Sequence, residues 1–202
     1  NSANSLDPKI QERARLHGSG GEWRVEKQRL RWEILEAYAK AAIQTGIPAT
    51  EDFNGGDNSG AGYFDVNQRS GWRWNTSKAF LRPIKKRPNL EIWTHAQVTK
   101  LNLITEADEQ KKCISVDVRS NGKDYTLDAR LEVLLSAGAI GSPQILQLSG
   151  IGCPAHLASV GVEVKHALKG VGQNLQDHLQ IRTVYGVEGV KALNKMASTL
   201  LG

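Results

Sequence analysis

The sequence has 202 residues, of which 40% are hydrophobic and 23% are charged. That balance is typical of a globular protein with a hydrophobic core, and it excludes a disordered or fibrous chain. No apolar run approaches the roughly 18 residues of a membrane-spanning helix, so we expect no transmembrane segment. The net charge is +5, but the basic residues are scattered and the tight cluster at 82–88 lacks interleaved aromatic residues. We expect that cluster to be a solvated surface loop, and we expect no nucleic-acid partner.

The cysteines and histidines give no sign of a disulfide framework or a metal site. Cys113 and Cys153 are far apart in the sequence, and the five histidines have no metal-ligand spacing among themselves or with the cysteines. This usage fits a reducing compartment. We expect a cytoplasmic protein, with peripheral attachment to the inner membrane as an open alternative.

The first half of the chain is predicted to contain one strong helix and one long loop. Apolar residues recur at helical spacing over residues 26–46, and a proline follows at Pro48. Residues 51–62 are rich in Gly, Asn and Asp, which predicts a long loop with a functional or packing role. A short helix is then expected, with Asn75 or Thr76 as its cap.

A three-stranded antiparallel meander is predicted next. Three stretches rich in β-branched and aromatic residues follow one another, at 90–104, 113–120 and 125–135. Asn121-Gly122 separates the second from the third and is a strong hairpin signal. The last of the three ends in Leu131–Leu135 (LEVLL), which is apolar on both faces. We therefore expect LEVLL to be a strand of a parallel sheet covered on both sides.

The rest of the chain is expected to form short elements. Ser142 is a plausible N-cap, and Pro143 suits the first turn of a helix that ends at Ser149-Gly150. The following elements are then predicted: a short helix from Pro154 to Gly161, a short strand at 162–168, a loop at 169–178 and a helix at 190–202. Ser149 in LSGIG is not a nucleophile elbow, because the G-x-S-x-G order is missing around it.

Small residues follow LEVLL at Ala137, Gly138 and Ala139. They would allow a ligand to approach the main chain closely. In open α/β sheets, ligands bind beyond the carboxyl ends of strands, where backbone N–H groups can hold phosphate. A tight corner, with small residues needed only for packing, explains these residues equally well.

The longer stretch SAGAIGSPQILQLSGIG (136–152) resembles the second signature of the glucose–methanol–choline (GMC) family of flavin oxidoreductases. Further blocks resemble that family in the same order: HGSGG at His17, DFNGG at Asp52, GAGYFDV at Gly60, NQRSGWRWNTSKAFLRP at Asn67, RPNLEIWTHAQVTKL at Arg87 and KGVGQNLQDH at Lys169. Within the family, the chain is most similar to the bacterial choline and alcohol dehydrogenase branch.

The resemblance implies an α/β fold: part of an FAD-binding, Rossmann-like domain with its three-stranded β-meander, plus part of a substrate-binding domain. Residues 1–85 would be substrate-side or linking, 86–178 would belong to the FAD-binding domain, and 179–202 would return toward the substrate domain. The family's G-x-G-x-x-G fingerprint and its catalytic histidine block have no match here. We therefore expect an interior segment of a longer enzyme that contains no catalytic residue.

The resemblance also implies three FAD-binding positions. The main chain of Val98 would meet the adenine, and Ala137 and Gly138 would lie beside the diphosphate–ribose region. Without the family, Val98 is an ordinary strand residue. Asp177-His178 falls in a block near the flavin, but adjacent side chains seldom face one another, so a structural hydrogen-bonding role is favoured over an acid–base pair.

The activity implied is FAD-dependent oxidation of an alcohol, choline-like or another primary alcohol, to an aldehyde by hydride transfer to flavin. The electron acceptor would be a quinone, a cytochrome or oxygen. Trp72 and Trp74 would either line a substrate channel or pack structurally. The alternative is that the isolated segment is non-catalytic and does not bind FAD alone.

Overall fold

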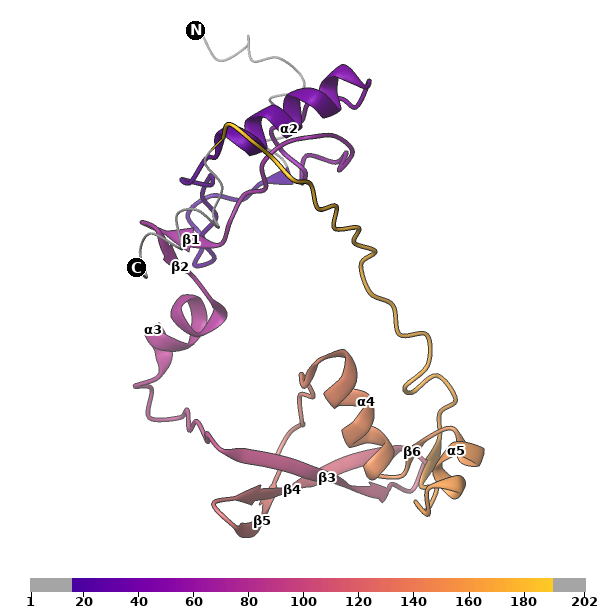
Figure 1. Ribbon diagram of the computed structural model, residues 1–202. Coiled ribbons are helices and arrows are strands. Elements are labelled where there is room, and N and C mark those ends of the chain that lie inside the picture. The colour runs from indigo at the N-terminus through magenta and orange to yellow at the C-terminus, as the bar shows by residue number, and fades with distance from the viewer. Residues whose placement is uncertain (1–15, 191–202) are drawn as a thin grey trace, which may run out of the picture. The chain divides into compact units, whose positions relative to one another are not determined.

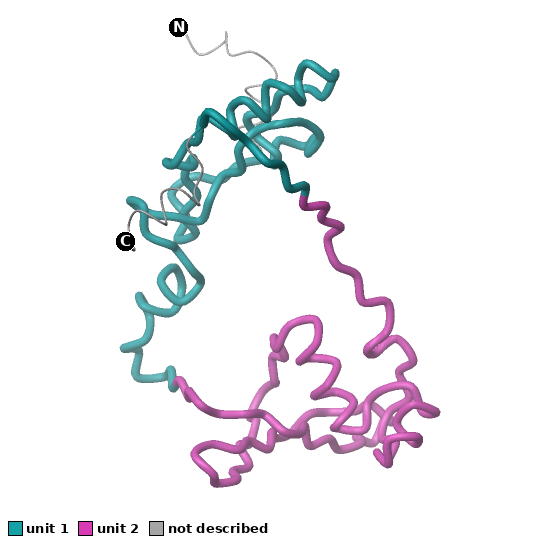
Figure 2. Tube along the Cα trace, viewed as in Figure 1, with its two compact units in different colours: residues 1–91, 183–202 teal, residues 92–182 magenta. Residues whose placement is uncertain are grey.

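The computed structural model describes residues 16–190. Contacts divide the chain into two compact units (Figure 2). The described residues of unit 1 are 16–91 and 183–190, and unit 2 comprises residues 92–182. The roles assigned above to 1–85, 86–178 and 179–202 stay predictions, because a division by contacts does not identify what each part binds.

Unit 1 contains helix α2 (Glu33–Gln44), which is shorter than the predicted 26–46 (Figure 1). The prediction is wrong at the start of the helix, because Glu26 forms an antiparallel bridge with Val66 instead. Its amide and carbonyl both pair with Val66, at 2.9 Å in each direction. The apolar residues keep helical spacing from residue 26 onward, but the backbone groups of Glu26 bond Val66 instead of forming helical hydrogen bonds.

The end of α2 follows the sequence prediction closely. Gly46 has a φ of +94°, the left-handed conformation that favours glycine after a helix. The Gly46 amide donates to the Ile43 carbonyl at 3.0 Å, and the Ile47 amide donates to the Ala42 carbonyl at 3.1 Å. This pair of bonds is a Schellman motif and satisfies carbonyls that the helix leaves unpaired.

The remaining elements of unit 1 are short. They are β1 (Gln68–Arg69), antiparallel to β2 (Trp72–Arg73), the π-helical turn η1 (Ser77–Leu81) and helix α3 (Arg82–Ile84). The Asn75 side chain accepts a hydrogen bond from the Lys78 amide at 3.0 Å, which confirms Asn75 as a cap. The loop predicted for the basic cluster is wrong over α3, because Pro83 falls in the first helical turn, where proline is tolerated.

Unit 2 contains the predicted meander. Strands β3 (Ala96–Thr105), β4 (Lys111–Ser120) and β5 (Lys123–Asp128) form an antiparallel sheet in the order β3-β4-β5. Asn121 and Gly122 both have positive φ, 51° and 75°, as a two-residue type I′ hairpin requires. The meander and its hairpin are therefore confirmed.

The strand predicted at Leu131–Leu135 is wrong. Strand β5 ends at Asp128, and residues 131–135 form no strand. Leu131 and Leu134 are 89% and 80% exposed. A strand that is apolar on both faces needs neighbouring strands and covering helices, and no described residues pair with this segment.

Helix α4 (Gly138–Leu148) begins before the predicted Ser142 start. The Ser142 hydroxyl accepts a hydrogen bond from the Ala137 amide at 3.0 Å, so it satisfies the backbone just before the helix rather than capping a later start. The proline signal was misleading, because Pro143 lies inside the helix.

The elements after α4 are largely as predicted. Helix α5 (Pro154–Ser159) confirms the short helix, and β6 (Ile151–Gly152) pairs in parallel with β7 (His166–Ala167). Residues 169–178 form a loop. The helix predicted at 190–202 lies outside the described residues from position 191 onward.

The core of unit 2 lies where α4 packs against β3 (Figure 1). Its buried apolar residues are Leu101, Val118, Ile145, Leu157 and Val171. Among residues 16–190, no helix is both long and apolar enough to cross a membrane.

Candidate functional site

The start of α4 leaves its main chain open to a ligand. Ala137 and Gly138 are both exposed. Gly138 has a φ of +84°, and no atom lies within 4 Å of the position where a Cβ would stand. Glycine reaches this conformation without the strain that other residues incur. The small residues of this segment therefore border open space rather than a packed corner.

The same place offers hydrogen-bond donors. The first amides of an α-helix have no partner within the helix, and no side chain caps α4. Helix α4 is 11 residues long, and its aligned peptide dipoles favour negative charge at this end. Free amides beside an uncrowded glycine suit a phosphate or diphosphate. The residues present thus fit the diphosphate of a dinucleotide.

A hollow of about 590 Å³ extends from the start of α4 along one of its sides. It is bordered by α4, by His156 of α5 and by the loop at 170–175. The Gln147 side chain donates a hydrogen bond to the Val171 carbonyl at 3.3 Å, which ties that loop to α4. Gly172 has a φ of +75°, and a Cβ there would stand 2.6 Å from the Gln147 side-chain nitrogen, so a larger residue would displace that amide.

Val98 lies in the same unit, on a strand with a free edge. Strand β3 is at one end of the sheet order, so on its outer side no described strand pairs with it. Val98 is half-buried, and its carbonyl accepts a hydrogen bond from the Gln97 side chain at 3.1 Å. An irregularity in the ladder separates Val98 from Lys100. The predicted contact between the Val98 main chain and the adenine stays a prediction.

The Asp177-His178 pair does not form an acid–base dyad. The Asp177 carboxylate accepts a hydrogen bond from the His178 backbone amide at 2.8 Å, and both residues are exposed. The described contacts include no bond between the carboxylate and the imidazole. This arrangement agrees with the structural role that the sequence favoured.

Sequence reasoning missed an imidazole–carboxylate pair in unit 1. The Nε2 atom of His17 lies 2.8 Å from a carboxylate oxygen of Asp52. The Asp52 side chain also accepts from the Asn54 amide at 2.9 Å, so the pair fixes the start of the 51–62 loop. His17 and Asp52 are 35 residues apart, and no local spacing could have linked them.

A polar network on the more exposed face of the sheet was also missed. The Asp117 carboxylate accepts hydrogen bonds from the Thr126 hydroxyl at 2.8 Å and the Asn102 side chain at 2.9 Å. These two bonds, with the nearby charge of Lys100, lower the pKa of Asp117 below its usual value. The three side chains belong to three strands, so the network holds the meander in register.

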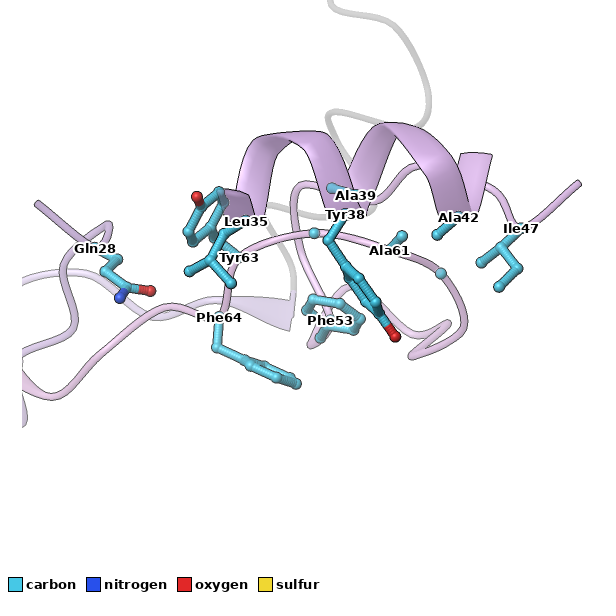
Figure 3. Close-up of a pocket in the computed structure, with 12 residues that line it drawn as sticks. Gln28, Leu35, Tyr38, Ala39, Ala42, Ile47, Phe53, Ala61, Tyr63 and Phe64 are labelled. Carbon is cyan, nitrogen blue, oxygen red and sulfur yellow. The ribbon is translucent and has the colours of Figure 1, made fainter. Parts of the chain in front are cut away.

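Unit 1 contains an aromatic hollow of about 510 Å³ beside α2 (Figure 3). Tyr38 points from the helix toward the loop that carries Phe53 (Figure 3). The Tyr63 hydroxyl is buried and has no hydrogen-bond partner among the described residues. Apart from the phenols of Tyr38 and Tyr63, the residues that line this hollow have no ionisable side chain, so it suits an apolar group.

The two tryptophans considered above differ. The Trp74 indole donates to the Glu22 carbonyl at 2.7 Å, and the Arg69 guanidinium lies 5.2 Å from the centre of a Trp74 ring, so Trp74 is held structurally. Trp72 is 75% exposed. Across the described residues, no group of three or more His, Cys, Asp or Glu side chains could hold a metal ion.

Comparison with known proteins identifies the family. The model of a family described as GMC oxidoreductase matches residues 12–180 of the chain. The chain belongs to this family. An oxygen-dependent choline dehydrogenase of Staphylococcus saprophyticus is 41% identical over 84% of this chain. The human mitochondrial choline dehydrogenase is 38% identical over 83%, and a Pseudomonas putida alcohol dehydrogenase [acceptor] is 36% identical over 84%.

Solved structures agree with this GMC assignment. An FAD-dependent oxidoreductase from Chaetomium thermophilum has a TM-score of 0.73 and 28% identity, covering 81% of this chain and 28% of its own. Pyridoxine 4-oxidase from Mesorbium loti has a TM-score of 0.66 and 29% identity, covering 75% and 29% respectively. These likenesses confirm the predicted fold class. The chain spans about 30% of the length of the curated relatives that it matches.

Proposed function

We propose that this GMC chain is part of an enzyme that oxidises an alcohol to an aldehyde with FAD. The carrying observation is the open start of α4, where an exposed Gly138 with positive φ lies beside uncapped helix amides. The family match and the choline and alcohol dehydrogenases among the relatives support the reaction class. The cofactor is FAD, which supplies the two-electron oxidation when it is bound.

In this proposal the chain's own residues bind and orient the cofactor. The amides at the start of α4 receive the diphosphate, with Ala137 and Gly138 leaving room beside its ribose. The main chain of Val98, at the free edge of β3, meets the adenine. No described residue is assigned to proton transfer. The base would be a histidine supplied from elsewhere in a complete GMC enzyme.

The substrate is proposed to be choline-like or another primary alcohol. The names of the matched relatives support this range, since they include choline dehydrogenases and an alcohol dehydrogenase. Oxygen, a quinone or a cytochrome would accept the electrons. A cytoplasmic location stays part of the proposal.

The isolated 202-residue chain is proposed not to hold FAD by itself. The G-x-G-x-x-G fingerprint has no match in this sequence, so the phosphate-binding glycines that face α4 would be supplied from outside it. This is the alternative raised from the sequence: the isolated segment of a flavoenzyme is non-catalytic and does not bind FAD alone.

The test compares the 202-residue chain with the complete polypeptide that contains it, each purified and then examined by visible absorbance. Flavin in the complete polypeptide, together with choline- or alcohol-dependent bleaching of its visible bands, is the expected result. Little or no flavin is expected on the 202-residue chain. Absence of flavin from the complete polypeptide after incubation with FAD would overturn the proposal.

A further inference from the structure

Ser149 is a fully buried polar residue at the end of α4. Its side chain is 0% exposed. The hydroxyl donates a hydrogen bond to the Ile145 carbonyl at 2.6 Å, within its own helix. The same oxygen accepts a hydrogen bond from the Leu101 amide of β3 at 2.8 Å. One hydroxyl therefore joins two elements that are 48 residues apart in the sequence.

The bond to β3 matters because of where it falls. Leu101 is only 5% exposed, and β3 has no described strand along its outer edge. Leaving a buried amide without a hydrogen-bond partner strongly destabilises the folded state. The Ile145 carbonyl does not depend on the hydroxyl in the same way, because it also accepts from the Ser149 amide at 3.1 Å. Removing the hydroxyl therefore leaves the edge of β3, rather than the helix, without its bond.

The proposed FAD contacts lie on or next to the two joined elements: Val98 on β3, Gly138 at the start of α4 and Ala137 just before it. Val98 is three residues before Leu101, about 10 Å along a strand. Gly138 is 11 residues before Ser149, about 16 Å along a helix. Ser149 is thus well removed along each element from the proposed FAD contacts. It can nevertheless fix how the strand and the helix lie relative to each other.

The neighbouring turn of α4 holds a third segment. Gln147 is two residues before Ser149 in the sequence, and its side chain donates a hydrogen bond to the Val171 carbonyl at 3.3 Å. That bond anchors the loop at 169–178, which borders the hollow beside α4. The last turn of α4 is therefore the place where the strand, the helix and the loop are held together.

We infer that Ser149 is a positioning residue of the cofactor site, which sets the edge of β3 against α4 so that adenine and diphosphate contacts form together. The inference rests on the proposed FAD function. A site that must be ordered at the moment of binding has a lower apparent affinity than one that is already formed. Loss of the hydroxyl should therefore weaken FAD binding and not only the stability of the fold.

Ser159 provides a matched control. Its hydroxyl donates to the His156 carbonyl at 2.7 Å, three residues earlier in α5, but it is exposed and bonds no second element. Ser159→Ala removes a similar helix-end bond without disconnecting β3 from α4. Ser149→Cys is the near-isosteric variant, since a thiol fills the same space but is a weak donor and acceptor.

The experiment uses the complete FAD-binding polypeptide, stripped of flavin, and titrates FAD against wild type, Ser149→Ala, Ser149→Cys and Ser159→Ala. Titrations are performed well below the melting temperature of each folded variant, so that loss of stability alone does not change the dissociation constant. Hydrogen exchange over 96–105 and 137–148 is followed with and without FAD. If Ser149→Ala does not fold, Ser149→Cys replaces it in every comparison.

The expected result is a dissociation constant raised about tenfold in Ser149→Ala, and less in Ser149→Cys, with Ser159→Ala close to wild type. FAD should protect both exchange segments in wild type and protect 96–105 less in Ser149→Ala. A Ser149 variant that melts earlier but binds FAD as wild type does would show a structural role only and overturn the inference. A wild-type protein that binds no FAD would overturn the proposed function itself, and this inference with it.

Discussion

Gly150 provides the sharpest test of how closely the backbone segments of unit 2 approach one another. It follows α4 directly and has a φ of +87°. A Cβ at this position would stand 2.5 Å from the Glu163 carbonyl oxygen and 3.2 Å from the Lys165 Cβ. The Gly150 carbonyl also accepts from the Lys165 amide at 2.8 Å. The chain before β7 therefore occupies the space that any side chain at Gly150 would need.

The expected loss of folding stability in Gly150→Ala has two parts that can be measured separately. Left-handed backbone costs a non-glycine residue about 1–2 kcal/mol. Forcing a methyl group into a packed contact adds about 1–3 kcal/mol. Gly161 follows α5 in a similar way, with a φ of +73°, but nothing lies within 4 Å of its Cβ position. Gly161→Ala should therefore lose only the first part, and Gly150→Ala should lose both, about 2–5 kcal/mol in all.

Urea unfolding followed by far-ultraviolet circular dichroism measures the free energy of unfolding for both variants. The difference between them isolates the contact with Glu163, because the backbone strain is common to both. Equal losses in Gly150→Ala and Gly161→Ala would refute the close approach of the two segments.

Two further changes test the sheet and the start of α4. The pKa of Asp117 is lower in the folded protein than in the unfolded chain. The ionised carboxylate therefore stabilises the fold at neutral pH, and this stabilisation is lost as the pH falls below about 4 and the carboxylate is protonated. Asp117→Asn should therefore be less stable than wild type near neutral pH and lose less stability in that acid range. Acid titration followed by circular dichroism measures this difference, and an acid profile like that of wild type would argue against the network. Gly138→Val should lower folding stability by about 1–2 kcal/mol, because valine is strained at the positive φ of this position. It should also weaken FAD binding, measured by titration, by crowding the open start of α4. An unchanged FAD affinity would show that Gly138 is not part of the site.

The meander could be predicted from the sequence because its signals are local. Alternating β-branched residues and an Asn121-Gly122 turn specify a hairpin without help from distant residues. The end of α2 was predictable for the same reason, since Gly46 alone can adopt the required conformation cheaply. The small residues at 137–138 left open space and a packed corner as equal alternatives, and the structure shows open space at the Gly138 Cβ position.

Two errors occurred where pairing with distant segments decides the structure. Residues 26–32 have a helical pattern, but Glu26 pairs with Val66 instead. Residues 131–135 have the pattern of a buried strand, but no described strand pairs with them. The third error is local: Ser142 and Pro143 resemble a helix start, yet α4 begins at Gly138 and the Ser142 hydroxyl bonds the Ala137 amide just before it.

The site could be predicted only in part. Val98, Ala137 and Gly138 were assigned by resemblance; the structure shows their exposure and conformation, and their roles toward FAD stay predictions. The bond from Leu101 to Ser149 spans 48 residues, and no motif records it. Ser149 lies within the block SAGAIGSPQILQLSGIG, but its partner on β3 can be found only from the contacts of the folded chain.

The most direct measurement of the central claim is the visible absorbance of the complete polypeptide after purification and incubation with FAD. We predict the absorption bands of bound oxidised flavin, which should bleach when a choline-like or other primary alcohol is added without oxygen. We predict little or no bound flavin on the 202-residue chain alone. A complete polypeptide that retains no flavin would contradict the proposed function.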